Sequence, residues 1–172
     1  MKNQTAFTLV ELLVAVAIFS IIGGIAAGVF TSGLRAQRKS LAYHELLNQT
    51  SYLMEYMSRS IRMDRKDLTG ACIDQNLNYK IVGAGINFKN YKGECQKFYL
   101  SAGQLKEEKG SIVSNLTSNH LQVANFNINL SGETQADNLQ PKVTLSLEII
   151  GKEQSKIRIQ TTVSQRNPDT ER

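Results

Sequence analysis

The chain has 172 residues and a formal net charge of +5, from twenty basic and fifteen acidic residues. This length allows one domain in addition to a membrane helix. The basic excess is spread along the chain, with eight basic against five acidic residues in 1–70 and twelve against ten in 71–172. A charge this mild and dispersed does not indicate a nucleic-acid-binding protein.

The N-terminus is a short polar leader followed by a long apolar run. Residues 1–5 carry one charged side chain, Lys2, and residues 12–30 are nineteen positions without any charge. A nineteen-residue helix is about 29 Å long, roughly the thickness of the hydrocarbon core of a bilayer. A single segment in lipid must be helical, because its backbone polar groups have no other partners there. We therefore expect one transmembrane helix, with Glu11 at its start.

Two general classes of segment compete for this region. A secretory signal peptide would place its cleavage site among the small residues at 23–28, but the apolar run is longer than such peptides use. A plain signal anchor explains the length and leaves Glu11 as an acid that suits the first turn of a helix near the membrane surface. Both interpretations stay open on these observations alone.

The sequence AFTLVE at residues 6–11 resembles the processing site of type IV prepilins and type II secretion pseudopilins. The resemblance implies that a prepilin peptidase cuts between Ala6 and Phe7 and that the new amino group of Phe7 is methylated. It also implies that Glu11 is the acidic residue near the mature terminus. Ala6 departs from the glycine usual in that family, which bears on the efficiency of cleavage.

The same resemblance implies a filament in which apolar helices pack together. A carboxylate in that environment needs a partner, since a lone buried charge is costly. The amino group of Phe7 on a neighbouring subunit can supply it. Gly24 and Gly28 form a GxxxG motif that allows close helix approach. Alternatively, Gly23 and Gly24 loosen the helix so that it partly melts on assembly.

The expected location is a single-pass cytoplasmic-membrane protein with its C-terminal domain outside the cytoplasm. Charge counting alone opposes this orientation, because Lys2 stands on the inner side while Arg35, Arg38 and Lys39 follow the apolar run. Cleavage of the leader and the two cysteines favour it, and the charge rule weakens when a folded domain follows.

Residues 31–70 read as an amphipathic helix continuous with the membrane segment. Apolar side chains recur at helical spacing, and charged side chains lie opposite them. The stripe consists of Ala42, Leu46, Leu53, Met57 and Ile61. We expect the helix to run from Phe7 to about Lys66, with Asp64, Asp67 and Gly70 at its end.

From residue 71 the pattern changes to short alternating segments typical of strands. The expected strands are 79–82, 86–88, 97–100, 104–106, 121–130, 143–149 and 157–163. Turns at 83–85 and 101–103 predict two hairpins, the turn at 151–155 predicts a third, and a phase shift within 121–130 predicts a bulge. The predicted class is α+β, an antiparallel sheet packed on the second half of the long helix.

The predicted organisation has five parts: a leader (1–6), a transmembrane and assembly helix (7–30), an amphipathic helix (31–70), a β domain (71–166) and a polar tail (167–172). Cys72 and Cys95 are expected to form a disulfide in an oxidising compartment, closing a loop worth roughly 3 kcal/mol. The alternative is two free buried thiols. No CxxC motif is present and the only histidines are His44 and His120, so we expect no metal site.

No catalytic or nucleotide-binding motif occurs in the sequence, so we expect neither an enzyme nor a cofactor. The predicted function is a minor pilin or pseudopilin, with other such subunits, the prepilin peptidase and membrane lipid as partners. The alternative is a filament-tip module that binds DNA or a secreted substrate. The cluster of Arg59, Arg62, Arg65 and Lys66 is read as a solvated helix face, with lipid headgroups, an acidic neighbouring subunit and DNA as alternatives.

Overall fold

The computed structural model describes residues 7–132 and 139–166. The predicted leader, including Ala6, and the predicted polar tail lie outside the described residues. The chain divides into two compact units, Met1–Leu41 and Ala42–Arg172. Each unit is described by itself below.

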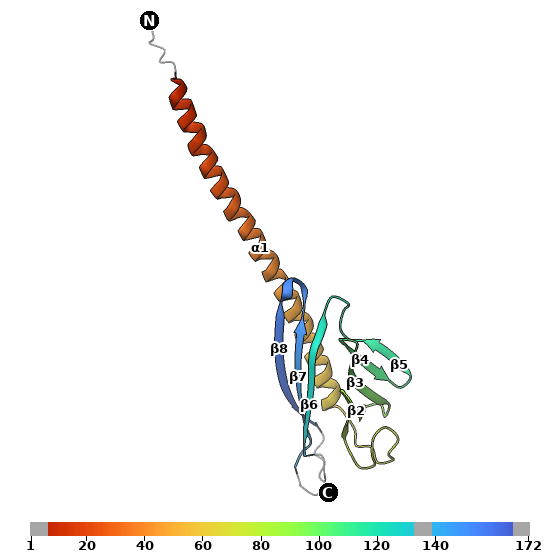
Figure 1. Cartoon of the computed structure of the whole chain (residues 1–172). Helices are drawn as coiled ribbons and strands as arrows, with labels where there is room; N and C mark the ends of the chain where they lie inside the picture. The colour runs from red at the N-terminus through yellow and green to blue at the C-terminus, as the bar shows by residue number, and fades with distance from the viewer. Residues whose placement is uncertain (1–6, 133–138, 167–172) are drawn as a thin grey trace. The chain divides into compact units, whose positions relative to one another are not determined.

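Helix α1 runs without interruption over Leu9–Arg62 (Figure 1). In the first unit every described side chain is exposed, although most of them are apolar. By length and composition, α1 includes a stretch that could cross a membrane. The predicted long helix is therefore confirmed, and its apolar first part makes no internal core.

The end of α1 differs from the prediction, because the helix stops at Arg62 rather than near Lys66. The N–H of Arg65 donates to the carbonyl of Lys89 at 2.9 Å, and the N–H of Asp67 donates to the carbonyl of Leu77 at 3.0 Å. Because these two N–H groups bond to residues 89 and 77, they cannot bond to carbonyls of the preceding helical turn, and the helix does not continue.

The second part of α1 packs on the β structure through the predicted apolar stripe. All five stripe residues are buried, and Met54 and Thr50 join them. The hydroxyl of Thr50 donates to the carbonyl of Leu46 at 2.7 Å, so its polar group is satisfied inside the helix. Apart from Ala42, the stripe forms one hydrophobic core together with apolar side chains of the strands.

The described residues of the second unit form eight strands in two antiparallel sheets. The bounds are β1 (Tyr79–Val82), β2 (Gly85–Lys89), β3 (Cys95–Ser101), β4 (Gln104–Lys109), β5 (Ile112–Asn115), β6 (Gln122–Ser131), β7 (Lys142–Ile150) and β8 (Lys156–Ser164). One sheet has the order β1-β2-β3-β4-β5 and the other has the order β6-β7-β8. The two sheets replace the single sheet that we expected.

The local predictions within the sheets are confirmed. The three expected hairpins are β1–β2, β3–β4 and β7–β8, the last joined by the short 3-10 helix η2 (Lys152–Gln154). The register shift between Val123 and Asn125 is the expected bulge. Val143, Leu145, Leu147 and Ile149 are fully buried, as their alternation predicted. Strand β5 was not predicted.

Candidate functional site

The start of α1 is built by Thr8 and Glu11. The N–H and the hydroxyl of Thr8 both donate to Oε2 of Glu11 at 3.0 Å, and the N–H of Glu11 donates back to Oγ1 of Thr8 at 3.3 Å. This reciprocal pair is a capping box, which satisfies backbone donors that the first turn leaves without helical partners. Phe7, just before it, is 81% exposed. Its neighbour Ala6 is outside the described residues.

The capping box was missed in the sequence, although the spacing Thr-x-x-Glu at residues 8–11 is its usual signature. Glu11 therefore has a role within its own chain as well as the predicted role between subunits. Both Thr8 donors end on the same oxygen of an exposed carboxylate. The geometry leaves the carboxylate accessible to a neighbouring group.

Gly24 and Gly28 lie on the uninterrupted helix, as predicted. A Cβ atom added at either position would meet no atom within 4 Å. The backbone is thus bare over this part of α1, which is the condition that close helix–helix approach requires. The structure shows no break at Gly23 and Gly24, and melting on assembly stays a prediction.

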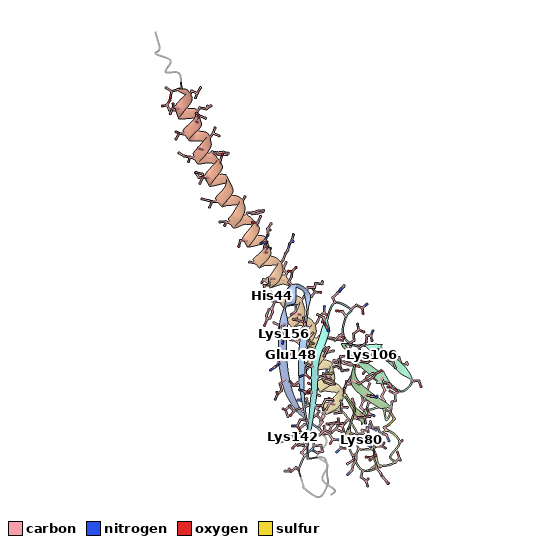
Figure 2. The ribbon with its side chains drawn as sticks, in the orientation of Figure 1. His44, Lys80, Lys106, Lys142, Glu148 and Lys156 are labelled. Carbon is pink, nitrogen blue, oxygen red and sulfur yellow. A yellow bond between two sulfur atoms is a disulfide. The ribbon has the colours of Figure 1, made fainter. Side chains whose placement is uncertain are left out.

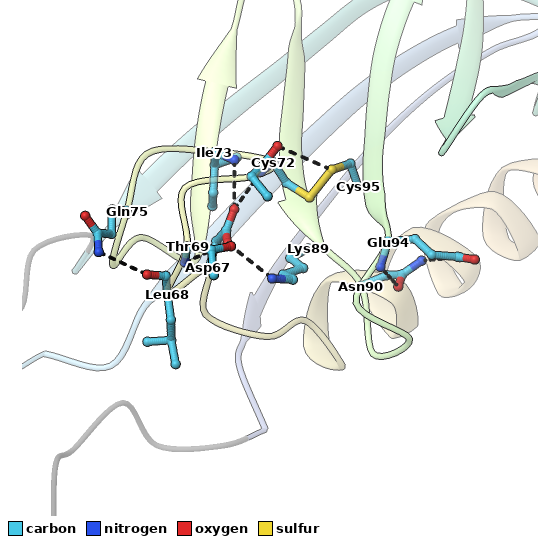
Figure 3. Close-up of polar contacts among 11 residues, drawn as sticks. Asp67, Leu68, Thr69, Cys72, Ile73, Gln75, Lys89, Asn90, Glu94 and Cys95 are labelled. Carbon is cyan, nitrogen blue, oxygen red and sulfur yellow. Dashed lines mark hydrogen bonds and ion pairs between the residues drawn. A yellow bond between two sulfur atoms is a disulfide. The ribbon is translucent and has the colours of Figure 1, made fainter.

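Cys72 and Cys95 form a disulfide, with Cα atoms 5.1 Å apart and a sequence separation of 23. The predicted pairing is therefore present. The disulfide links the irregular segment after α1 to the first residue of β3. Figure 3 shows it beside a group of hydrogen bonds centred on Asp67.

Asp67 has a fully buried side chain that accepts hydrogen bonds from several parts of this segment (Figure 3). Its Oδ2 accepts from the N–H of Cys72 at 2.6 Å and of Ile73 at 3.2 Å. Its Oδ1 accepts from the hydroxyl of Thr69 at 2.9 Å and from Nζ of Lys89 at 3.2 Å. We expected Asp67 at a helix end, whereas it organises a loop.

Burial by itself would raise the pKa of the Asp67 carboxyl. The surrounding donors outweigh burial and hold that pKa well below its usual value of 3.8. The side chain is therefore a carboxylate at neutral pH. A buried carboxylate with this many donors is a structural centre, because its lone pairs are already used.

A second polar network joins α1 to the larger sheet. The hydroxyl of Tyr56 donates to Oε1 of Glu107 at 2.7 Å, and Nε2 of Gln96 donates to the same oxygen at 2.5 Å. Burial, together with the hydrogen bond and charge of Glu107, raises the pKa of Tyr56 to about 12. This network keeps the Glu107 carboxylate satisfied on the helix-facing side of β4.

On the smaller sheet, Glu148 accepts from Arg158 and forms an ion pair with Lys156 at 2.5 Å (Figure 2). These hydrogen bonds lower the pKa of Glu148. The predicted basic cluster is not gathered on one helix face, because Arg65 and Lys66 lie beyond the end of α1. Arg59 pairs with Glu55 at 2.7 Å.

The remaining candidates for chemistry are dispersed. His44 lies on α1 and His120 precedes β6, and both are exposed. Within residues 7–132 and 139–166, no three side chains of His, Cys, Asp or Glu are placed to hold a metal ion. The absence of catalysis and of cofactors stays a prediction.

Comparison with known proteins gives one match. Residues 1–27 match the family model described as the prokaryotic N-terminal methylation motif. No curated protein and no solved structure matches the chain. The match covers the predicted processing site, the capping box and Gly24, and it confirms the resemblance stated for the N-terminus.

Proposed function

We propose, from the premise that this chain carries the prokaryotic N-terminal methylation motif, the hallmark of type IV prepilin-like proteins, that it is a minor pilin or pseudopilin. It would assemble through its N-terminal helix into a type IV pilus or a type II secretion pseudopilus. The observation that carries the proposal is the motif, which extends into the first part of α1, an apolar segment whose side chains are all exposed.

In the proposed pathway the prepilin peptidase cuts between Ala6 and Phe7 on the cytoplasmic face of the membrane. The exposed side chain of Phe7 and the start of α1 only at Leu9 support access to this bond. The C-terminal domain lies outside the cytoplasm. The disulfide supports this orientation, because disulfides persist in oxidising compartments. The domain acts structurally, without catalysis.

Glu11 would change partners on assembly. In the single chain it caps its own helix together with Thr8. Among packed apolar helices, the amino group of a neighbour's Phe7 offers a partner of opposite charge, which a carboxylate removed from water requires. A subunit in the wrong axial position would leave the Glu11 carboxylate and the Phe7 amino group unpaired. The ion pair would therefore favour one axial register between neighbouring subunits.

The test separates the cap from the intersubunit pair. Glu11→Gln and Glu11→Ala should leave cleavage intact, giving a chain whose mass begins at Phe7 with one added methyl group. Both changes should deplete the subunit from the sheared filament fraction. Thr8→Val is the matched control, since it removes the capping hydroxyl and keeps the carboxylate.

Equal loss of assembly for Thr8→Val and Glu11→Gln would mean that Glu11 acts only as a helix cap. A mature chain beginning after Gly28 would instead identify a cleaved signal peptide. The minor role is tested by the ratio of this subunit to the principal subunit in purified filaments, which should be low.

A further inference from the structure

The five-stranded sheet has two edges, and both are short strands. Among the strands of the described residues, β1 pairs with β2 alone and β5 pairs with β4 alone. Each edge strand has four residues. An edge strand presents unpaired N–H and C=O groups that can pair with another strand.

The register identifies the free groups on β5. The N–H of Leu116 donates to the carbonyl of Leu105, which makes these two residues a hydrogen-bonded pair. Such pairs alternate along an antiparallel ladder, so Ile112 and Ser114 bond to β4. The N–H and C=O groups of Val113 and Asn115 therefore point away from the sheet.

The same reasoning applies to β1. The N–H of Leu100 donates to the carbonyl of Ala84, so the even-numbered residues of β2 bond to β3 and its odd-numbered residues bond to β1. Their partners on β1 are Lys80 and Val82. The backbone groups of Tyr79 and Ile81 therefore point away from β2, and of these two residues only Ile81 is accessible, because Tyr79 is 2% exposed.

The side chains of both edges are unusually apolar for exposed positions. Ile112 is 73% exposed and Val113 is 54% exposed, while Ile81 and Val82 are 43% and 40% exposed. Natural edge strands are commonly protected by charged residues or proline. Among these eight edge residues only Lys80 is charged, and it is paired with Asp74.

We propose that β5 of one copy of this chain pairs with β1 of a second copy, so that the sheet continues from subunit to subunit. This inference rests on the proposed function, because filament subunits share one axial direction. All pairings in the sheet are antiparallel, so β1 and β5 run the same way. If the second copy is shifted sideways, perpendicular to the strands, its residues 42–62 run in the same direction as those of the first copy. They also pack on the same face of the continued sheet.

Pairing of β5 with a second β5, or of β1 with a second β1, lacks this property. Antiparallel pairing of like edges makes the second copy run in the opposite direction. Parallel pairing of like edges keeps the direction but places the helix of the second copy on the opposite face of the sheet. A head-to-tail contact between unlike edges does not close on itself, which suits a filament. The contact requires only two adjacent copies, so it is compatible with a short run of a minor subunit.

When the two strands overlap along their full length, the backbone groups at the join also match the hydrogen-bond pattern of a parallel strand pair. Val113 lies opposite the second copy's Lys80, and its carbonyl faces the N–H of the second copy's Ile81. The N–H of Asn115 faces the carbonyl of the same Ile81. Asn115 then lies opposite the second copy's Val82. Both accessible backbone groups of Ile81 are thereby used, and Val113 lies diagonally across the join from the second copy's Val82.

The test uses the full chain in cells that assemble the filament. Two forms, Val82→Cys and Asn115→Cys, are co-expressed and treated with a short bismaleimide reagent, which leaves the native disulfide intact. Paired strands lie about 4.8 Å apart, so crosslinked dimer is expected in the filament fraction. The matched control is Lys106→Cys with Val82→Cys, because Lys106 lies opposite Asn115 but one strand farther from the join.

Each single-cysteine form alone should give no dimer above this control, and self-crosslinking would overturn the head-to-tail arrangement. Ile81→Pro removes one outward N–H without disturbing the ladder to β2, and it should lower crosslinking about fivefold, the effect of one lost hydrogen bond. Ile81→Thr, which retains the N–H, should not. Filaments that contain the subunit but give no specific crosslink would overturn the inference alone, whereas failure of the unmodified chain to enter filaments would overturn the proposed function.

Discussion

Asp67 is the side chain on which the path of the chain after α1 depends. It is fully buried and accepts bonds from backbone groups as well as from Lys89. We predict that Asp67→Asn lowers the free energy of unfolding by about 3 kcal/mol, since an amide cannot satisfy donors arranged around a carboxylate. Urea unfolding at neutral pH measures this. Asp74→Asn, at an exposed ion pair, is the control and should change stability by less than about 1 kcal/mol.

The same residue predicts an acid-sensitive part of the stability. The pKa of Asp67 is lower in the folded chain than its usual value of 3.8, so its contribution is complete well above that value. As the pH falls below about 5, the unfolded chain binds the proton first, and the contribution declines. Asp67→Asn should therefore flatten the stability profile between pH 5 and 2, whereas an unchanged slope would assign the acid limb to other carboxyls.

At the scale of elements, two interactions hold the segment between α1 and β3 in place: the disulfide and the hydrogen bonds to Asp67. The disulfide acts mainly on the unfolded chain by restricting a loop of about two dozen residues. We predict that replacing both cysteines by serine lowers the free energy of unfolding by roughly 3 kcal/mol. Reduction of the unmodified chain should have the same effect and should leave the doubly substituted chain unchanged.

The hydrogen bonds to Asp67 do not require the disulfide bond, so the segment between α1 and β3 should keep its folded path when the disulfide is absent. Amide exchange of Ile73, whose N–H bonds to Asp67, reports this directly. Protection of that amide should persist in the serine variant at neutral pH. Its loss there, with the rest of the domain still folded, would show that the disulfide alone holds the loop.

At the scale of the whole molecule, the exposed apolar segment and the hydrophobic core belong to different units. Every described residue of 7–41 is exposed, whereas the complete hydrophobic core lies within Ala42–Arg172. We predict that residues 42–172 fold cooperatively and stay soluble without detergent, while the full chain partitions into membranes. Thermal unfolding and membrane fractionation check the two parts. Aggregation of the shorter chain with its disulfide formed would contradict this division.

The sequence by itself determined the features that depend on local patterns. The apolar run and the helical stripe predicted α1, because a helix repeats over neighbouring turns. Alternation and glycine turns predicted the hairpins, because each pairs adjacent segments. At the candidate site, the motif at residues 6–11 and the two cysteines were recognised, while the Thr8 cap was overlooked although its spacing was visible.

Only the tertiary structure decided the features that depend on distant partners. Arg62 ends α1 because the following backbone bonds to residues near 77 and 89, and no local breaker marks that point. Strand β5 has no alternating pattern, and it becomes a strand by pairing with β4. The division into two sheets follows from β6 pairing with β7 rather than with β5. Asp67 likewise has partners up to 22 residues away, so its role arises from a fold that brings donors together around one carboxylate.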